Sequence, residues 1–152
     1  MFDIFSTIII ILASCTVSFY IGKKLRMGIG LSLTIYSIHT LYCVAYWVYS
    51  KYYITDAILY YENAQIKGDL SFQIGTGFVT YITKFFVDTI GSSELNTYLV
   101  FNMFGVIGCI FLLRILLDIW PKVGGINKFM PYIIMLLPGN SFWGVAIGKD
   151  GI

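Results

Sequence analysis

Four apolar runs, each about long enough to cross a lipid bilayer, constrain this chain most strongly. They occupy residues 4–22, 27–49, 95–117 and 129–148. The hydrocarbon core of a bilayer requires roughly 20 consecutive apolar residues in a helix, and each run comes close to that length. Pro131, Pro138 and Gly139 interrupt the fourth run, so we expect a kinked or broken helix there.

The composition predicts the same class of protein. Only 12% of the residues are charged and 58% are hydrophobic, whereas a soluble domain carries about 25% charged residues. Water cannot solvate such a surface, so we expect an integral membrane protein. The predicted fold class is an all-α membrane protein with about four transmembrane helices and two interfacial helices, in a single membrane domain over residues 1–152. The net charge of +2 gives no indication of a nucleic-acid partner.

The distribution of charge predicts the orientation. Lys23, Lys24 and Arg26 follow the first run, and Arg114, Lys122 and Lys128 outnumber Asp118 after the third. Residues 50–94 instead carry three lysines against five carboxylates. Because basic loops stay in the cytoplasm, we expect a multi-pass protein whose N-terminus and residues 50–94 are extracytoplasmic.

Residues 50–94 are too apolar for a solvated loop and too polar to cross a membrane. Asp56, Tyr60 and Ala64 lie at i, i+4 and i+8, on one face of a helix that Thr55 can cap. A second amphipathic piece follows, with apolar residues at helical spacing between positions 74 and 85. We expect two helices in the membrane interface, which either form part of a site or only brace the spans.

Asp56, Lys149 and Asp150 are the candidate functional charges, because the predicted topology places all three on the outer side. A carboxylate such as Asp56 can act as a general base or help to bind a divalent cation; it can also simply cap its helix. The Lys149 ammonium suits a phosphate, although an isolated lysine can also snorkel to the membrane surface. Asp150 can pair with Lys149 or bind a sugar or a metal.

Other polar residues favour structural roles. His39 lies in the middle of the second run, where an ionisable group is a functional candidate. No carboxylate or second histidine accompanies it, so we expect a neutral histidine that hydrogen-bonds between helices, and we interpret Asn102 in the same way. The glycine and lysine at 148–149 do not match a phosphate-binding loop, because Trp143 and Asp150 replace required residues.

A family resemblance rests on three stretches. They are "ITDAILYYENA" (54–64), "GTGFVTYITKFFVDTIGSSELNTYLVFNMFGVIGCIFLLRILLD" (75–118) and "LLPGNSFWGVAIGKDGI" (136–152). In this order they resemble the N-terminal part of GT-C-type glycosyltransferases, the polyprenyl-phosphate-sugar-dependent enzymes that include protein mannosyltransferases and bacterial envelope sugar transferases. The resemblance implies that residues 1–152 are a truncated N-terminal part of a larger transmembrane domain, inactive alone, in a bacterial inner or plasma membrane.

The resemblance also implies roles for individual residues. Asp56 would be the catalytic base or an acceptor-binding carboxylate, and Tyr60, Lys149 and Asp150 would bind substrate, with Lys149 on the donor phosphate. A sugar would pass from a lipid-linked polyprenyl-phosphate donor to an envelope glycan, lipid or protein. The cofactor stays open, with a divalent cation as the candidate. Two alternatives remain: a polysaccharide polymerase-type membrane protein and a non-enzymatic small membrane subunit.

Overall fold

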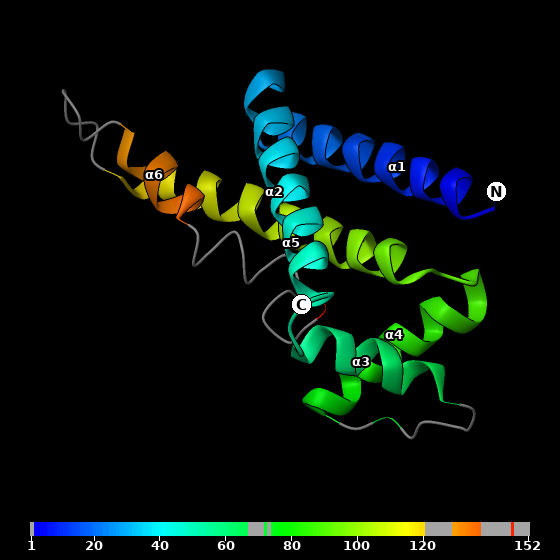
Figure 1. Ribbon diagram of the computed structural model, residues 1–152. Coiled ribbons are helices and arrows are strands. Elements are labelled where there is room, and N and C mark those ends of the chain that lie inside the picture. Colours follow the sequence, from blue (N-terminus) through cyan, green and yellow to red (C-terminus); the bar gives the residue numbers. More distant parts are fainter. Residues whose placement is uncertain (1, 67–71, 73, 121–128, 138–146, 148–152) are drawn as a thin grey trace.

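The fold is helical throughout the part of the chain that the structure describes. The structure is a computed structural model that describes residues 2–66, 72, 74–120, 129–137 and 147. These residues form six helices and no strand (Figure 1): α1 (Phe2–Lys24), α2 (Ile29–Ser50), α3 (Asp56–Gln65), α4 (Thr76–Ile90), α5 (Glu94–Ile119) and α6 (Met130–Leu136). The helices α1, α2 and α5 are long and apolar enough to cross a membrane. The predicted all-α fold is therefore confirmed for these residues, with three helices that could span a membrane.

The expected fourth span is described only at its start. There α6 is a helix of seven residues with Pro131 in its first turn, where proline is tolerated. Leu137, the residue before Pro138, has extended backbone angles, because a residue that precedes proline avoids the helical region. The break predicted from the prolines is therefore present at this point. Residues 138–146 and 148 lie outside the described residues.

Polar contacts bring three helix ends together. Asn96, in the first turn of α5, accepts a hydrogen bond from Thr7 at 2.6 Å and donates one to Ser6 at 2.8 Å. Lys51, directly after α2, forms an ion pair with Glu94 at the start of α5. The N-terminal ends of α1 and α5 and the C-terminal end of α2 therefore share one end of the bundle. The helices α3 and α4 lie at this end (Figure 1).

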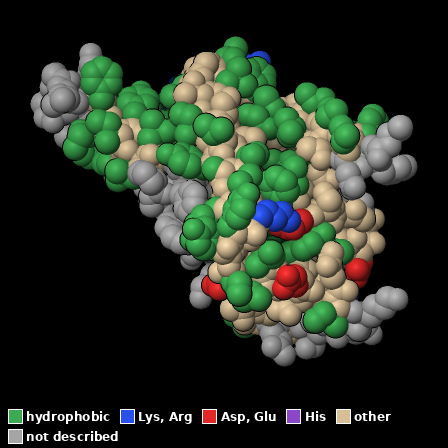
Figure 2. Space-filling model, in the orientation of Figure 1, with side chains coloured by type: hydrophobic (Ala, Val, Ile, Leu, Met, Phe, Trp, Pro, Cys, Tyr) green, Lys and Arg blue, Asp and Glu red, His purple; other side chains and the backbone are tan. Residues whose placement is uncertain are grey.

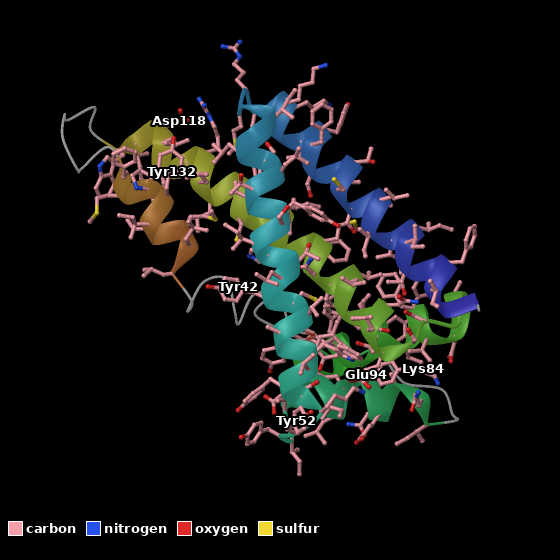
Figure 3. The ribbon with its side chains drawn as sticks, turned by 45° about the horizontal axis from the view of Figure 1, so that its top comes forward. Tyr42, Tyr52, Lys84, Glu94, Asp118 and Tyr132 are labelled. Carbon is pink, nitrogen blue, oxygen red and sulfur yellow. The ribbon has the colours of Figure 1, made fainter. Side chains whose placement is uncertain are left out.

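Charged side chains lie toward the two ends of the bundle. Figure 3 shows Lys84 and Glu94 at the end that carries α3 and α4, and Asp118 near the opposite end. In the face seen in Figure 2, the visible acidic side chains gather over the α3–α4 end, and hydrophobic side chains dominate the rest. The structure therefore places residues 50–66 and the N-terminus of α1 at one end of the bundle.

Short local sequences set the helix ends. The Thr55 hydroxyl accepts a hydrogen bond from the Ile58 amide at 3.5 Å and so caps α3, as predicted. The Ser93 hydroxyl accepts one from the Asn96 amide at 3.5 Å and caps α5. Gly91 ends α4 with a φ of 62°, a left-handed conformation that glycine adopts without strain. The two predicted interfacial segments are therefore helices with defined ends.

A lysine holds α3 and α4 together. The Lys84 ammonium donates hydrogen bonds to the backbone carbonyls of Ala64 at 3.4 Å and Ile66 at 3.1 Å. It also lies 3.3 Å from the Asp88 carboxylate, one turn further along α4. The last carbonyls of α3 have no partner within their own helix, so Lys84 both satisfies them and joins the two helices.

We expect Lys84→Met to destabilise the α3–α4 pair while keeping the aliphatic stem of the side chain. Loss of charge-assisted hydrogen bonds to the two carbonyls should lower local stability by about 1–3 kcal/mol. Hydrogen exchange of the amides in α3 and α4 measures this change. Asp88→Asn is the control, because it removes an exposed ion pair worth about 0.3–0.5 kcal/mol and leaves the carbonyl contacts in place. Equal protection in wild type and Lys84→Met would contradict the role of Lys84.

Candidate functional site

Asp56 lies at the bundle end where the three helix ends meet. It is the first residue of α3, exposed to solvent, and follows the capping residue Thr55. The carboxylate lies within electrostatic range of the phenol of Tyr46, near the end of α2. Asp56 is therefore an accessible carboxylate at the α3–α4 end of the bundle.

The face of α3 that begins at Asp56 turns inward. Tyr60 and Ala64, predicted to share the Asp56 face, are 9% and 0% exposed. Tyr60 belongs to a core cluster with Tyr46, Tyr98 and Val79, which joins α3 to α2, α5 and α4. Tyr60 is thus mostly enclosed by protein, and its predicted contact with substrate stays a prediction.

Ile147, from a distant part of the chain, belongs to the core cluster that also includes residues of α3. Its side chain is 1% exposed and packs in the same cluster as Ala57 and Tyr60. Ile147 stands two positions before Lys149 in the sequence. Lys149 and Asp150 lie outside the described residues. Their predicted placement beside Asp56 therefore stays a prediction, and the structure shows only that Ile147 is buried in a cluster that also includes residues of α3.

Four tyrosines form a row beside Asp56. The ring centroids of Tyr98 and Tyr46 lie 6.2 Å apart, those of Tyr46 and Tyr49 lie 6.1 Å apart, and Tyr49 stacks on Tyr53 at 4.6 Å. The row passes from the buried core to the surface, because Tyr98 is fully buried while Tyr53 is 59% exposed. This row was not predicted from the sequence. The spacing of Tyr46, Tyr49 and Tyr53 at i, i+3 and i+7 was the available indication.

Lys51 makes two side-chain contacts at the same end of the bundle. Lys51, paired with Glu94, also places its ammonium 5.3 Å from the centroid of the Trp47 ring. Cation–π contacts of this kind stabilise an exposed lysine by about 0.5–1 kcal/mol. These contacts hold the end of α2 against the start of α5. They therefore also hold in place the short segment after α2 that leads to Thr55 and Asp56.

The predicted role of His39 as a bridge between helices is confirmed. Its Nδ1 lies 3.3 Å from Asn102 Oδ1, and its Nε2 lies 3.0 Å from Cys109 Sγ. The Asn102 amide nitrogen donates to the Thr40 hydroxyl at 3.2 Å. Because Asn102 Oδ1 faces Nδ1 in this arrangement, Nδ1 carries the proton and Nε2 of the neutral ring accepts from the thiol. The four side chains thus join the middle of α2 to α5.

We expect His39→Leu to weaken the packing of α2 on α5 without changing the orientation of the protein in the membrane. Hydrogen bonds between transmembrane helices contribute about 0.6 kcal/mol on average and about 1.7 at most. A double-mutant cycle with Asn102→Leu, read from thermal unfolding in detergent, isolates the pair. A coupling near zero would show that the two residues stabilise the bundle independently.

The described residues do not form a metal site. Within the described ranges, no three His, Cys, Asp or Glu side chains gather where they could hold a metal ion. Cys15, Cys43 and Cys109 are all free thiols, and the last two are buried in the helix interfaces, as small apolar residues are. A cation bound by Asp56 therefore stays a prediction from the sequence.

The chemical groups at the α3–α4 end are an exposed carboxylate, a row of tyrosines and a lysine–glutamate pair. They define the candidate site, and its proposed function must follow from their chemistry and placement.

No protein-family model, curated protein or solved structure matches this chain.

Proposed function

We propose that this chain is part of a GT-C-type integral membrane glycosyltransferase that uses a polyprenyl-phosphate-linked sugar. One observation supports the proposal: Ile147 is buried in the core cluster that also contains Ala57 and Tyr60 of α3, the helix that begins at Asp56. Because Ile147 stands two positions before Lys149 in the sequence, we place Lys149 and Asp150 near this end of the bundle. A base and a phosphate-binding cation at one membrane surface are the groups that such a transfer requires.

In the proposed reaction, Asp56 accepts the proton of an acceptor hydroxyl. The acceptor oxygen then bonds to the anomeric carbon as the bond from that carbon to the donor phosphate oxygen breaks. Polyprenyl phosphate leaves with the electron pair of the broken bond. Lys149 stabilises the negative charge that develops on this phosphate, and Asp150 holds either Lys149 or the sugar.

The proposed topology places this reaction outside the cytoplasm. Lys23, Lys24 and Arg26 lie at the end of the bundle away from Asp56, and basic residues favour the cytoplasmic side. We further propose that α3 and α4 lie in the outer membrane interface and that residues 129–148 form a fourth, broken span. The exposed aromatic residues Tyr52, Phe72 and Phe85 at the α3–α4 end suit that interface.

Donor turnover tests the proposed function. The protein, expressed from its natural reading frame and held in nanodiscs, is given decaprenyl phosphate linked to glucose, mannose or galactose together with an extract of envelope glycans. We expect at least one donor to release free decaprenyl phosphate in a protein-dependent reaction. Release of no decaprenyl phosphate from any donor would contradict the proposal and favour the non-enzymatic subunit.

A further inference from the structure

The stacked rings of Tyr49 and Tyr53 form a fixed aromatic surface beside Asp56. Their centroids lie 4.6 Å apart with 24° between the ring planes. The Tyr53 amide donates to the Tyr49 carbonyl at 3.2 Å, so the backbone holds the two rings in register. The side chains are 42% and 59% exposed, which leaves ring surface open to a ligand.

Tyr46 connects this surface to the candidate base. Its ring is 4% exposed and lies 6.1 Å from the Tyr49 ring. Its phenol interacts with the Thr55 side chain and lies within electrostatic range of the Asp56 carboxylate. Tyr53 itself stands three positions before Asp56 in the chain, so a ligand on the two outer rings would lie in the neighbourhood of Asp56.

The chemistry of this surface suits a sugar ring. The face of a tyrosine ring carries partial negative charge, and the C–H groups on one face of a hexopyranose carry partial positive charge. A tyrosine offers a large contact area at a low cost in conformational entropy. The sugar hydroxyls need hydrogen-bond acceptors and donors, which Asp56, Thr55 and the tyrosine phenols supply.

We propose that Tyr49 and Tyr53 form a carbohydrate platform that holds the hexopyranose ring of the donor or acceptor next to Asp56. The proposal rests on the proposed function, because it assigns the sugar to the same site. A membrane-interface tyrosine without a ligand would contact lipid alone. The two roles differ in one property: the platform distinguishes a lipid that carries a sugar from the same lipid without one.

Binding measurements on single variants test the platform. Full-length protein in nanodiscs is titrated with decaprenyl phosphate and with decaprenyl phosphate linked to glucose, mannose or galactose, and Kd is measured for each lipid. Tyr53→Ala removes the outer ring, and Tyr53→Phe keeps it without the hydroxyl. Tyr52→Ala is the matched control, because Tyr52 lies in the same turn and is 79% exposed.

We expect wild type to bind at least one sugar-bearing lipid more tightly than decaprenyl phosphate. Loss of one aromatic contact should weaken that binding by about 3- to 10-fold in Tyr53→Ala, while Kd for decaprenyl phosphate stays unchanged. Tyr53→Phe, which keeps the ring and loses only the hydroxyl, should lose less of this binding than Tyr53→Ala. Tyr52→Ala should bind both lipids as wild type does.

Three outcomes would contradict the platform. In the first, Tyr53→Ala binds decaprenyl phosphate and the sugar-bearing lipids equally more weakly, which indicates membrane contact alone. In the second, Tyr53→Ala has the same Kd values as wild type, and in the third, wild type binds no sugar-bearing lipid more tightly than decaprenyl phosphate. The proposed function is tested separately by donor turnover in wild type and in Asp56→Asn. Normal turnover in Asp56→Asn would contradict the role of Asp56 as the base, but it would leave the Kd values of the Tyr53 variants open. Unchanged Kd in Tyr53→Ala would contradict the platform, but it would leave the role of Asp56 open.

Discussion

Replacement of Asp56 by asparagine is expected to lower kcat for donor turnover by about 10²- to 10⁴-fold, the range typical for loss of a general base. Asparagine has nearly the same shape and stays compatible with the first turn of α3, which Thr55 caps. It cannot accept the proton of the acceptor hydroxyl. The loss should therefore appear in kcat, while thermal unfolding and donor Kd change little.

Glu62→Gln is the matched control for this change. Glu62 lies in the same helix six positions further on and is also exposed. Its carboxylate lies away from the face that starts at Asp56, so we expect wild-type kcat. Equal losses in the two variants would indicate a general effect of charge on α3. Unchanged kcat in Asp56→Asn would exclude Asp56 as the base.

Replacement of Gly22 by leucine is expected to separate α1 from α2. A Cβ atom at Gly22 would lie 1.9 Å from the Ser32 hydroxyl oxygen and 2.8 Å from Ser32 Cβ. Ser32 is 1% exposed, so it has little room to move away. Overpacking typically costs about 1–3 kcal/mol, and we expect a loss of at least this size because small residues allow membrane helices to approach closely.

Gly108→Leu measures the effect of adding the same side chain where there is space. Apart from its chain neighbours and the adjacent backbone of its own helix, no atom lies within 4 Å of a Cβ built at Gly108, which is an exposed position in α5. We expect this variant to unfold at or above the wild-type temperature in detergent, since leucine is a better helix former than glycine. Equal losses of stability in the two variants would contradict close packing at Gly22.

Features encoded within short stretches could be predicted from the sequence. The lengths of α1, α2 and α5 follow from the apolar runs, and the caps at Thr55 and Ser93 follow from the hydroxyl residues that precede each helix. The break after α6 follows from Pro138. The caps and the break depend on residues within about one helical turn, where the preferences of single residues for helix ends are strong.

Features that depend on how helices cross could not be predicted in this way. Asn96 forms hydrogen bonds with Ser6 and Thr7, which lie about 90 positions earlier in the sequence. Lys51 and Glu94 form an ion pair only because α2 and α5 meet at one end of the bundle. Periodicity put Asp56 and Tyr60 on one face, but it does not show that the helix end projects into solvent while its second turn is enclosed. The tyrosine row crosses from α2 to α5 for the same reason.

The proposed mechanism requires positions 56 and 149 to face the same, extracytoplasmic side of the membrane. Single cysteines introduced as Asp56→Cys, Lys149→Cys and Lys24→Cys, in a background without Cys15, Cys43 and Cys109, test it by reaction with a membrane-impermeant maleimide on intact cells. We predict labelling at positions 56 and 149 and labelling at position 24 only after permeabilisation. Labelling of positions 56 and 149 from opposite compartments would contradict the proposed mechanism.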